Sequence, residues 1–201
     1  GGGGRIAIYV TDTTTQATLP PHRVTFNLKA GDGDRAETLG TLHLSAPSLL
    51  DCTWLPHNAV ISLGELPLWN TGAFTLNGWI QLKPYGDNQQ FFNFTVNSLV
   101  LGSSNARLDL HQTLLTVATD LVVTNSGRLF LYAAATSAND EGYGALVDIA
   151  GTLLVGANSW IYPASEKQTG NSILFRASDI EVQADGGIDA LVQIPLGSAA
   201  P

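Results

Sequence analysis

Three carboxylates near the start of the chain have the residue types and spacing that could bind a hard cation. Asp32 and Asp34 flank a glycine, and Glu37 follows shortly after them. Calcium prefers several carboxylate and carbonyl oxygens, which a glycine turn can bring together. The spacing matches neither an EF-hand nor the glycine-aspartate nonapeptide of calcium-binding β-rolls, so a solvated acidic turn is the favoured interpretation and a calcium site the alternative. A second acidic stretch, residues 139–141, is interpreted in the same way.

The sequence has no recognisable catalytic signature. Glycoside hydrolysis needs paired carboxylates, and β-elimination needs an acidic residue with Lys or Arg beside it. The candidate carboxylates occur singly, and no basic partner recurs beside them: Asp109, Asp120, Asp148 and Asp179. The four histidines share no metal-ligand spacing, and the single Cys52 is typical of a buried apolar residue. We therefore predict a protein that is not an enzyme and holds no cofactor, with a polysaccharide lyase or glycosidase as the alternative.

Aromatic and amide side chains point to contact with glycans. Trp79 and Trp160 are candidates for stacking on sugar rings, although packing in a core or an interface is the commoner role of such residues. Asn93 begins the one Asn-X-Thr sequon of the chain. In a secreted eukaryotic protein Asn93 would be exposed and would carry an N-linked glycan.

The elements that must position these side chains follow a recurring apolar pattern. An alternating apolar pair is followed, after a short polar turn, by further apolar positions. The units are Leu66/Leu68 then Phe74/Leu76, Leu99/Leu101 then Leu108/Leu110, Leu121/Val123 then Leu129/Leu131, Leu153/Val155 then Ile161, and Ile180/Val182 then Ile188. One such unit cannot bury its apolar face without a neighbour stacked on it, so the pattern predicts a solenoid.

Each unit is interpreted as three short strands separated by tight corners. An apolar residue lies six positions before several anchor residues: Val60, Leu115, Val147 and Leu174. The corners contain residues that tolerate a left-handed backbone, at 125–127, 158–159 and 185–187. We expect an all-β chain folded as a right-handed parallel β-helix, with a β-sandwich or jelly roll as the alternative.

The N-terminal segment is predicted to be distinct from this body. Residues 1–20 form a glycine-rich lead and a strand, and residues 21–201 form a single β-solenoid domain. The strand starts at Arg5 and places Ile6, Ile8 and Val10 on one face. A β-helix leaves backbone hydrogen-bonding groups open at both ends, and the sequence has no amphipathic capping helix. These four residues are therefore predicted to add a strand to a neighbour.

Composition narrows the range of partners. The net charge is −8 and the nine basic residues are scattered, which disfavours nucleic-acid binding. Only 13% of the residues are charged, and no apolar run is long enough to span a bilayer. The abundance of Thr, Ser, Asn and Gly together with this low charge favours an extracellular β-protein.

Two segments of the chain resemble a known group of proteins. The glycine tract running into R-I-A-I-Y at residues 1–9 resembles the coil junctions of large secreted, glycine-rich β-helical proteins of bacteria and protists. The segment FRASDIEVQADGGIDA at residues 175–190 is similar to rungs of the same group. The resemblance implies a secreted or cell-surface repeat protein and supplies no catalytic residues. We expect an extracellular structural module that assembles head to tail in a fibre or acts as a spacer in a larger surface protein. Its expected partners are copies of itself or flanking domains, and a non-catalytic glycan-binding adhesin module is a further alternative.

Overall fold

The structure is a computed structural model that describes residues 4–12, 14, 40–45, 59–63, 68–84, 91–136 and 142–190. The regular elements within these ranges are all β-strands. Their bounds are β1 (Arg5–Ile8), β2 (Gly40–Leu44), β3 (Ala59–Leu63), β4 (Leu68–Leu76), β5 (Trp79–Pro84), β6 (Phe92–Leu101), β7 (Arg107–His111), β8 (Thr113–Val117), β9 (Leu121–Val123), β10 (Arg128–Tyr132), β11 (Ala145–Val155), β12 (Trp160–Ala164), β13 (Ile173–Val182) and β14 (Gly187–Ile188).

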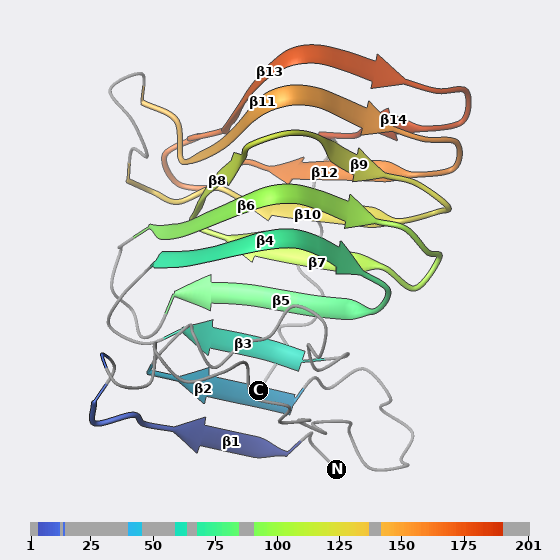
Figure 1. Cartoon of the computed structure of the whole chain (residues 1–201). Coiled ribbons are helices and arrows are strands. Elements are labelled where there is room, and N and C mark those ends of the chain that lie inside the picture. Colours follow the sequence, from blue (N-terminus) through green and yellow to red (C-terminus); the bar gives the residue numbers. More distant parts are fainter. Residues whose placement is uncertain are drawn as a thin grey trace, which may run out of the picture.

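Two sheets contain these strands (Figure 1). Sheet A has the order β1-β2-β3-β5-β7-β10-β12-β14, and sheet B has the order β13-β11-β8-β6-β4, with β9 between β11 and β6. Every pairing between described strands is parallel. The all-β prediction is confirmed, and the parallel pairing is compatible with a β-helix. Sandwiches and jelly rolls are built from antiparallel strands, which the described part of the chain does not contain.

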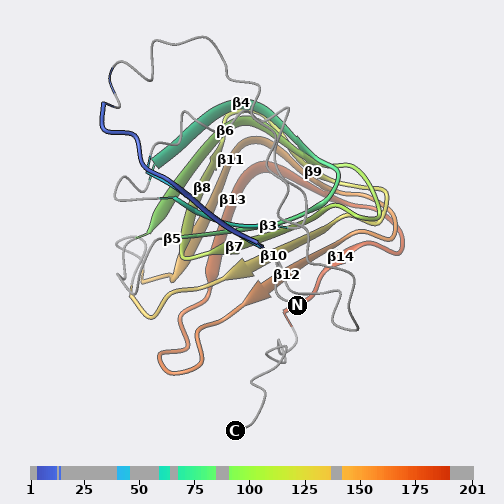
Figure 2. The ribbon, with the colours of Figure 1, turned by 90° about the horizontal axis from the view of Figure 1, so that it is seen from below.

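The chain passes alternately through the two sheets, and we call each passage through sheet B and then sheet A a layer. In the described residues the layers are β4–β5, β6–β7, β8–β9–β10, β11–β12 and β13–β14. The long strands of sheet B bend in the middle, and in the third layer the two halves are the separate strands β8 and β9. Seen end-on, the strands therefore enclose a triangular core (Figure 2).

The core consists of columns in which equivalent apolar residues of successive layers lie on one another. One column of sheet B contains Phe74, Leu99, Leu121 and Leu153, and the matching column of sheet A contains Ile80, Leu108, Leu129 and Ile161. All eight side chains are fully buried. Burying a side chain of this size stabilises the fold by about 1.5–3 kcal/mol, so the columns supply most of the driving force.

The corners from sheet B into sheet A have equal length in the last three layers and are left-handed at the same position, and the first of them is left-handed at Asn125 as well. These corners are residues 124–127, 156–159 and 183–186. Their third positions, Ser126, Asn158 and Asp185, have φ values of 65°, 56° and 62°. The predicted left-handed corners are therefore confirmed, and these three layers turn at the same point.

The return connections from sheet A to sheet B differ greatly in length. Gln112 alone joins β7 to β8, whereas residues 133–144 join β10 to β11 and residues 165–172 join β12 to β13. The polar excursions seen in the sequence lie in these connections. The buried columns keep their register on both sides of them.

The first unit predicted from the sequence is wrong in its register. Phe74 and Leu76 pair with Leu99 and Leu101, so they form the first pair of their layer and not the second. Ile80 and Leu82 form the second pair. The cause is the short corner at residues 77–78, which brings the sheet A strand closer in sequence than the usual six-residue step.

The strand predicted to precede Ile180 in the last unit, around Leu174, is also wrong by one residue. The column of Phe94, Leu115 and Val147 continues to Phe175, not to Leu174. The bend of β13 has one residue fewer than the bend of β11, because the register shifts between Ile149 and Thr152. Val60, expected in the same role, lies in β3 of sheet A.

The N-terminal strand β1 pairs with β2 of its own chain. Ile6 and Ile8 continue the columns of Leu42 and Leu44 and pack against the core, while Arg5 faces outward and is exposed. Val10 follows the strand, and its backbone N–H donates a hydrogen bond of 2.7 Å to Ser45 Oγ. The segment expected to pair away from its body is thus the edge strand of sheet A, and its outer edge faces no described strand.

Gly127 provides a test of the close stacking of corners. A Cβ atom at this position would lie 2.7 Å from the carbonyl oxygen of Leu101 and 3.0 Å from that of Thr124. Backbone cannot move aside as a side chain does, so Gly127→Ala should lower the free energy of unfolding by about 1–3 kcal/mol. Gly102→Ala is the matched control, because its nearest neighbour, Val100 Cγ1, would be at an ordinary 3.5 Å. Equal unfolding midpoints in urea for the two variants would contradict this account.

Candidate functional site

The outward face of sheet A carries a band of aromatic and charged side chains. Because the strands are in parallel register, residues of the same position lie in a column across the sheet. The first column contains Trp79, Arg107, Arg128 and Trp160, the second contains Gln81, Asp109, Phe130 and Tyr162, and the third contains His111 and Tyr132. The alternation of side chains along each strand places all of these residues on the face opposite the core.

Arg107 is held at the centre of this band by three groups. Its guanidinium lies 4.3 Å from the ring centroid of Trp79 and 4.2 Å from that of Phe130. Its Nε and Nη2 atoms donate hydrogen bonds of 2.8 and 2.9 Å to the two carboxylate oxygens of Asp109. Stacking between two rings and a bidentate ion pair are both interactions that arginine makes and lysine does not.

Asp109 is 2% exposed, and its carboxylate also accepts a 3.2 Å hydrogen bond from Trp79 Nε1. Burial raises the pKa of this carboxyl, while the hydrogen bond and the charge of Arg107 act in the opposite direction. Both oxygens accept from Arg107 on the same strand, and one of them also accepts from Trp79 on the neighbouring strand β5. The carboxylate is therefore suited to fixing Trp79 and Arg107 rather than to proton transfer.

His111 lies next to this cluster and is kept neutral. Its ring stacks on Tyr132 with centroids 4.2 Å apart, and its Nε2 is 2.5 Å from Nε2 of Gln81. Burial, followed by the nearby charge of Lys83, lowers the pKa of His111 from 6.5 to about 4. The Nε2 atom of a neutral ring accepts a hydrogen bond from the side-chain amide of Gln81, whereas a protonated ring would place its own N–H donor against that amide N–H.

Two further aromatic residues extend the band towards the last layer. Phe130 stacks on Tyr162 with centroids 4.6 Å apart, and Tyr162 lies 6.4 Å from Trp160. The Trp160 ring covers Gly187, where a Cβ atom would come within 2.7 Å of it. The band thus runs without interruption from β5 to β14.

A hollow of about 550 Å³ lies where this band meets the corners of the first layers. Its walls are Asn77, Gly78, Trp79, Ser104, Asn105, Ala106, Arg107 and Arg128. We call it the Arg128 hollow, because Arg128 is its exposed cation.

The second notable feature is the open end of the last layer. Leu153, Val155 and Ile161 in the fourth layer are fully buried. Their equivalents in the last layer, Ile180, Val182 and Ile188, are 52, 47 and 41% exposed. No described strand lies beyond β13 or β14. An apolar row and an open backbone edge are therefore presented together.

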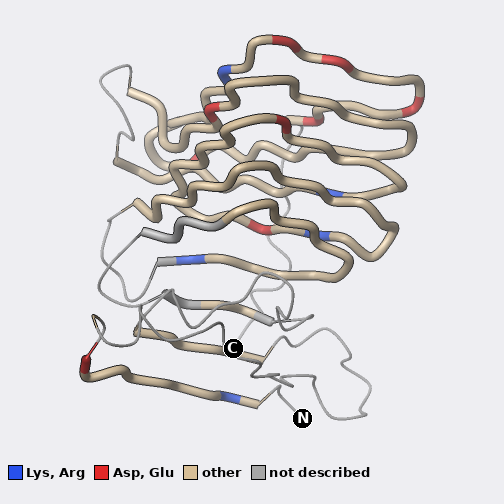
Figure 3. Tube along the Cα trace, viewed as in Figure 1, with Lys and Arg blue, Asp and Glu red and all other residues tan. Residues whose placement is uncertain are grey.

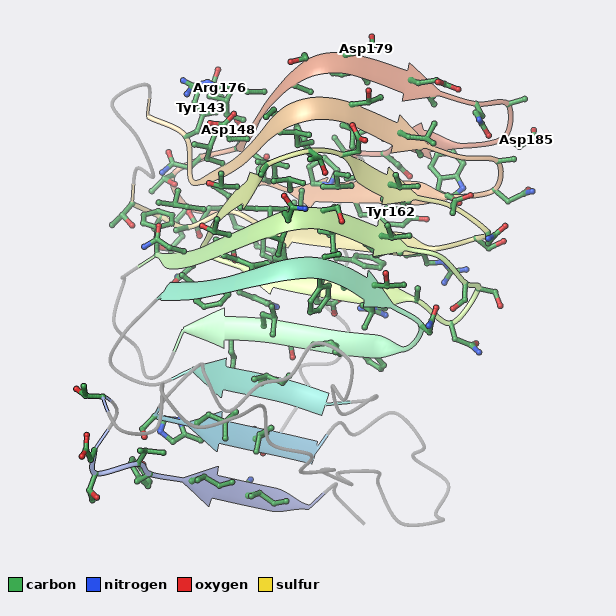
Figure 4. The ribbon with its side chains drawn as sticks, viewed as in Figure 1. Tyr143, Asp148, Tyr162, Arg176, Asp179 and Asp185 are labelled. Atoms are coloured by element: carbon green, nitrogen blue, oxygen red, sulfur yellow. The ribbon has the colours of Figure 1, made fainter. Side chains whose placement is uncertain are left out.

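Acidic residues predominate at this open end, where Arg176 is the exposed basic residue of β13. Asp179 and Glu181 are exposed on β13, and Asp185 is exposed at the following corner. Figure 3 shows that several acidic residues lie on the upper layers, and Figure 4 shows Asp179 and Asp185 on the outermost one. Charge on an edge strand discourages pairing with an identical edge. The end is thus biased towards a partner of different charge.

The structure brings together two of the residues predicted to contact glycans. Trp79 and Trp160 start strands in the same sheet and share the first outward column. Asn93 lies within β6 with a half-buried side chain, and glycosylation there stays a prediction. Asp32, Asp34, Glu37 and the stretch 139–141 lie outside the described residues. Within the described part, no group of three or more His, Cys, Asp or Glu is placed to hold a metal ion.

The expectation that Asp109 lacks a basic partner is wrong. Arg107 is two positions away, and in a strand this spacing places both side chains on one face. The alternating sequence R-L-D-L-H at residues 107–111 was the signal that could have revealed the pair.

The chain matches no protein-family model, no curated protein and no solved structure. In the described residues, no helix is long and apolar enough to cross a membrane. The functional proposals therefore rest on the outward band of sheet A, the Arg128 hollow and the open last layer.

The Arg107–Asp109 pair provides one test of the band. Arg107→Leu should lower the free energy of unfolding by about 3–5 kcal/mol, because a buried carboxylate loses its counter-charge. Replacing both residues, with Arg107→Leu and Asp109→Leu together, should recover most of this loss. Chemical unfolding of the two variants and the single Asp109→Leu variant measures the coupling. Additive effects of the two substitutions would show that the pair does not act as a unit.

His111 makes stability depend on pH. The unfolded chain binds a proton at His111 near pH 6.5 and the folded chain only near pH 4. Stability from the neutral ring is therefore present above pH 6.5 and is lost as the pH falls towards 4, by about 3 kcal/mol for the full shift. His111→Gln should flatten this part of the profile of unfolding free energy against pH. An unchanged slope in the variant would assign the dependence to other groups.

Proposed function

We propose that the chain is a structural module, a right-handed parallel β-helix whose open C-terminal layer is covered by the N-terminal edge of a second copy. The single observation that carries this proposal is the exposure of Ile180, Val182 and Ile188, which occupy core columns. Leaving three such side chains in water forfeits roughly the stabilisation that their counterparts gain in the layer below. A further parallel layer would bury them and pair the edges of β13 and β14.

The register of sheet A favours a second copy as the occupant. One outward column starts at Arg5 in β1 and runs through Thr41, Val60, Gln81, Asp109, Phe130 and Tyr162. Asp189 follows β14 in this column, since its N–H donates a 2.8 Å hydrogen bond to the Ile161 carbonyl. Stacking a second copy in the same register therefore places its Arg5 against Asp189.

One apolar residue of β1 follows the same register. The inward neighbour of Arg5 is Ile6, which would join the column beyond Pro163. The acidic last layer would meet the end of the chain that carries Arg5. Opposite charges in register guide association, whereas two acidic ends would repel each other. Head-to-tail growth is thus favoured over end-to-end pairing, and repeated growth gives a fibre. An extracellular location for this assembly stays a prediction.

Charge reversal at the proposed contact tests this arrangement. Sedimentation velocity over a wide range of protein concentration should show assembly of the unmodified chain. Arg5→Glu or Asp189→Lys should each weaken assembly about tenfold by placing like charges in contact, and the two substitutions together should restore it. Lys167→Glu is the matched control, because Lys167 is exposed in the connection between β12 and β13. An unmodified chain that stays monomeric at every concentration would overturn the proposal.

A second set of variants separates assembly from folding. Ile180→Ser with Val182→Ser should abolish assembly and leave the unfolding midpoint of the monomer nearly unchanged, because both side chains are already exposed. Leu153→Ser, at the equivalent buried position, should instead destabilise the monomer by about 2–5 kcal/mol. Assembly that survives the loss of Ile180 and Val182 would place the contact elsewhere, as in a spacer joined only to flanking domains.

A second candidate function is non-catalytic glycan binding. The observation that favours it is the position of Trp79 and Trp160 in one outward column, next to Phe130 and Tyr162. Aromatic side chains on a flat, rigid sheet face provide apolar surface with polar edges, which suits ligands of mixed polarity. The lateral face stays free when layers stack at the ends, so the two functions are compatible.

A further inference from the structure

The Arg128 hollow has the size and lining of a binding site for one or two sugar rings. Its volume of about 550 Å³ falls within the range of small-ligand sites. Asn77, Ser104 and Asn105 place amide and hydroxyl groups along one wall, and Trp79 provides an aromatic wall. The lining therefore combines apolar surface with several hydrogen-bonding groups.

The aromatic wall is rigid before any ligand arrives. Trp79 Nε1 donates to Asp109, and the guanidinium of Arg107 stacks on the Trp79 ring. Arg107 is itself fixed by Asp109 and Phe130. A ligand thus meets a preformed surface and loses little affinity to ordering of the protein.

The two arginines of the hollow differ in whether an acidic residue balances their charge. The charge of Arg107 is balanced by the buried Asp109 carboxylate. Arg128 is exposed and forms no ion pair with any described residue. No acidic residue lines the hollow, although the chain as a whole has a net charge of −8. The hollow therefore offers one uncompensated cation at the edge of an aromatic and polar surface.

We infer that the Arg128 hollow binds an acidic saccharide, with the carboxylate of a uronic acid on Arg128 and the sugar hydroxyls on the polar groups of Asn77, Ser104 and Asn105. A guanidinium binds a carboxylate through two parallel hydrogen bonds, which gives strength and fixes orientation. A nucleic acid would need several cations in a row, which this face does not have. The inference rests on the glycan-binding candidate above and is independent of head-to-tail stacking.

The experiment uses a galacturonic acid hexamer and the same hexamer with its carboxylates methyl-esterified. The two probes differ only in charge at the carboxylate, so their comparison isolates the proposed contact. Isothermal titration calorimetry with the full chain should show binding of the acid form and weakening by about tenfold or more on esterification. Arg128→Gln should weaken binding of the acid form by a similar factor. Lys167→Gln, which removes a cation far from the hollow in sequence, should leave it unchanged.

The outcomes separate this inference from the function on which it rests. Equal binding of both probes, unaffected by Arg128→Gln, would overturn the acidic specificity and leave glycan binding intact. Binding of neither probe would overturn both. Equal losses in Arg128→Gln and Lys167→Gln would reveal attraction to general positive charge and would also overturn the inference. Circular dichroism of each variant confirms that its strands are intact.

Discussion

The structure depends on the in-register parallel pairing of each strand with its equivalent in the next layer. This register places Leu99 on Leu121 and Leu121 on Leu153, so each of these buried side chains stacks on an apolar side chain of the next layer. A slip by one residue would turn every side chain of a strand to the opposite face. The same register sets the outward columns, so the core and the functional face are determined by a single constraint.

This constraint explains which features could be predicted from the sequence. The apolar pairs around Leu121 and Leu153 recur with a constant step because their corners have equal length, and the all-β class and most columns follow from them. The prediction failed at Phe74, where the corner is two residues shorter, and at Phe175, where the bend is one residue shorter. Apolar spacing in sequence cannot distinguish a shorter corner from a shifted strand, whereas pairing in space can.

The outward face was harder to predict because its contacts cross between layers. Arg107 and Asp109 are neighbours in sequence, but Trp79 and Phe130 reach them only through stacking of β5, β7 and β10. Only the structure shows that Arg107 forms an ion pair with Asp109 and that Arg128 forms none with any described residue. The two tryptophans singled out in the sequence gain their significance from sharing a column, a relation that depends on the number of residues in each intervening layer.

The unequal return connections have a consequence for how such a chain can diverge. One residue suffices between β7 and β8, and twelve lie between β10 and β11 without disturbing the columns on either side. The length of these return connections can therefore change while the core stays the same, because the free-energy cost of closing a loop rises only slowly as the loop grows. These connections are therefore the positions at which inserted segments, such as grafted epitopes, would be tolerated at the spacing of successive layers.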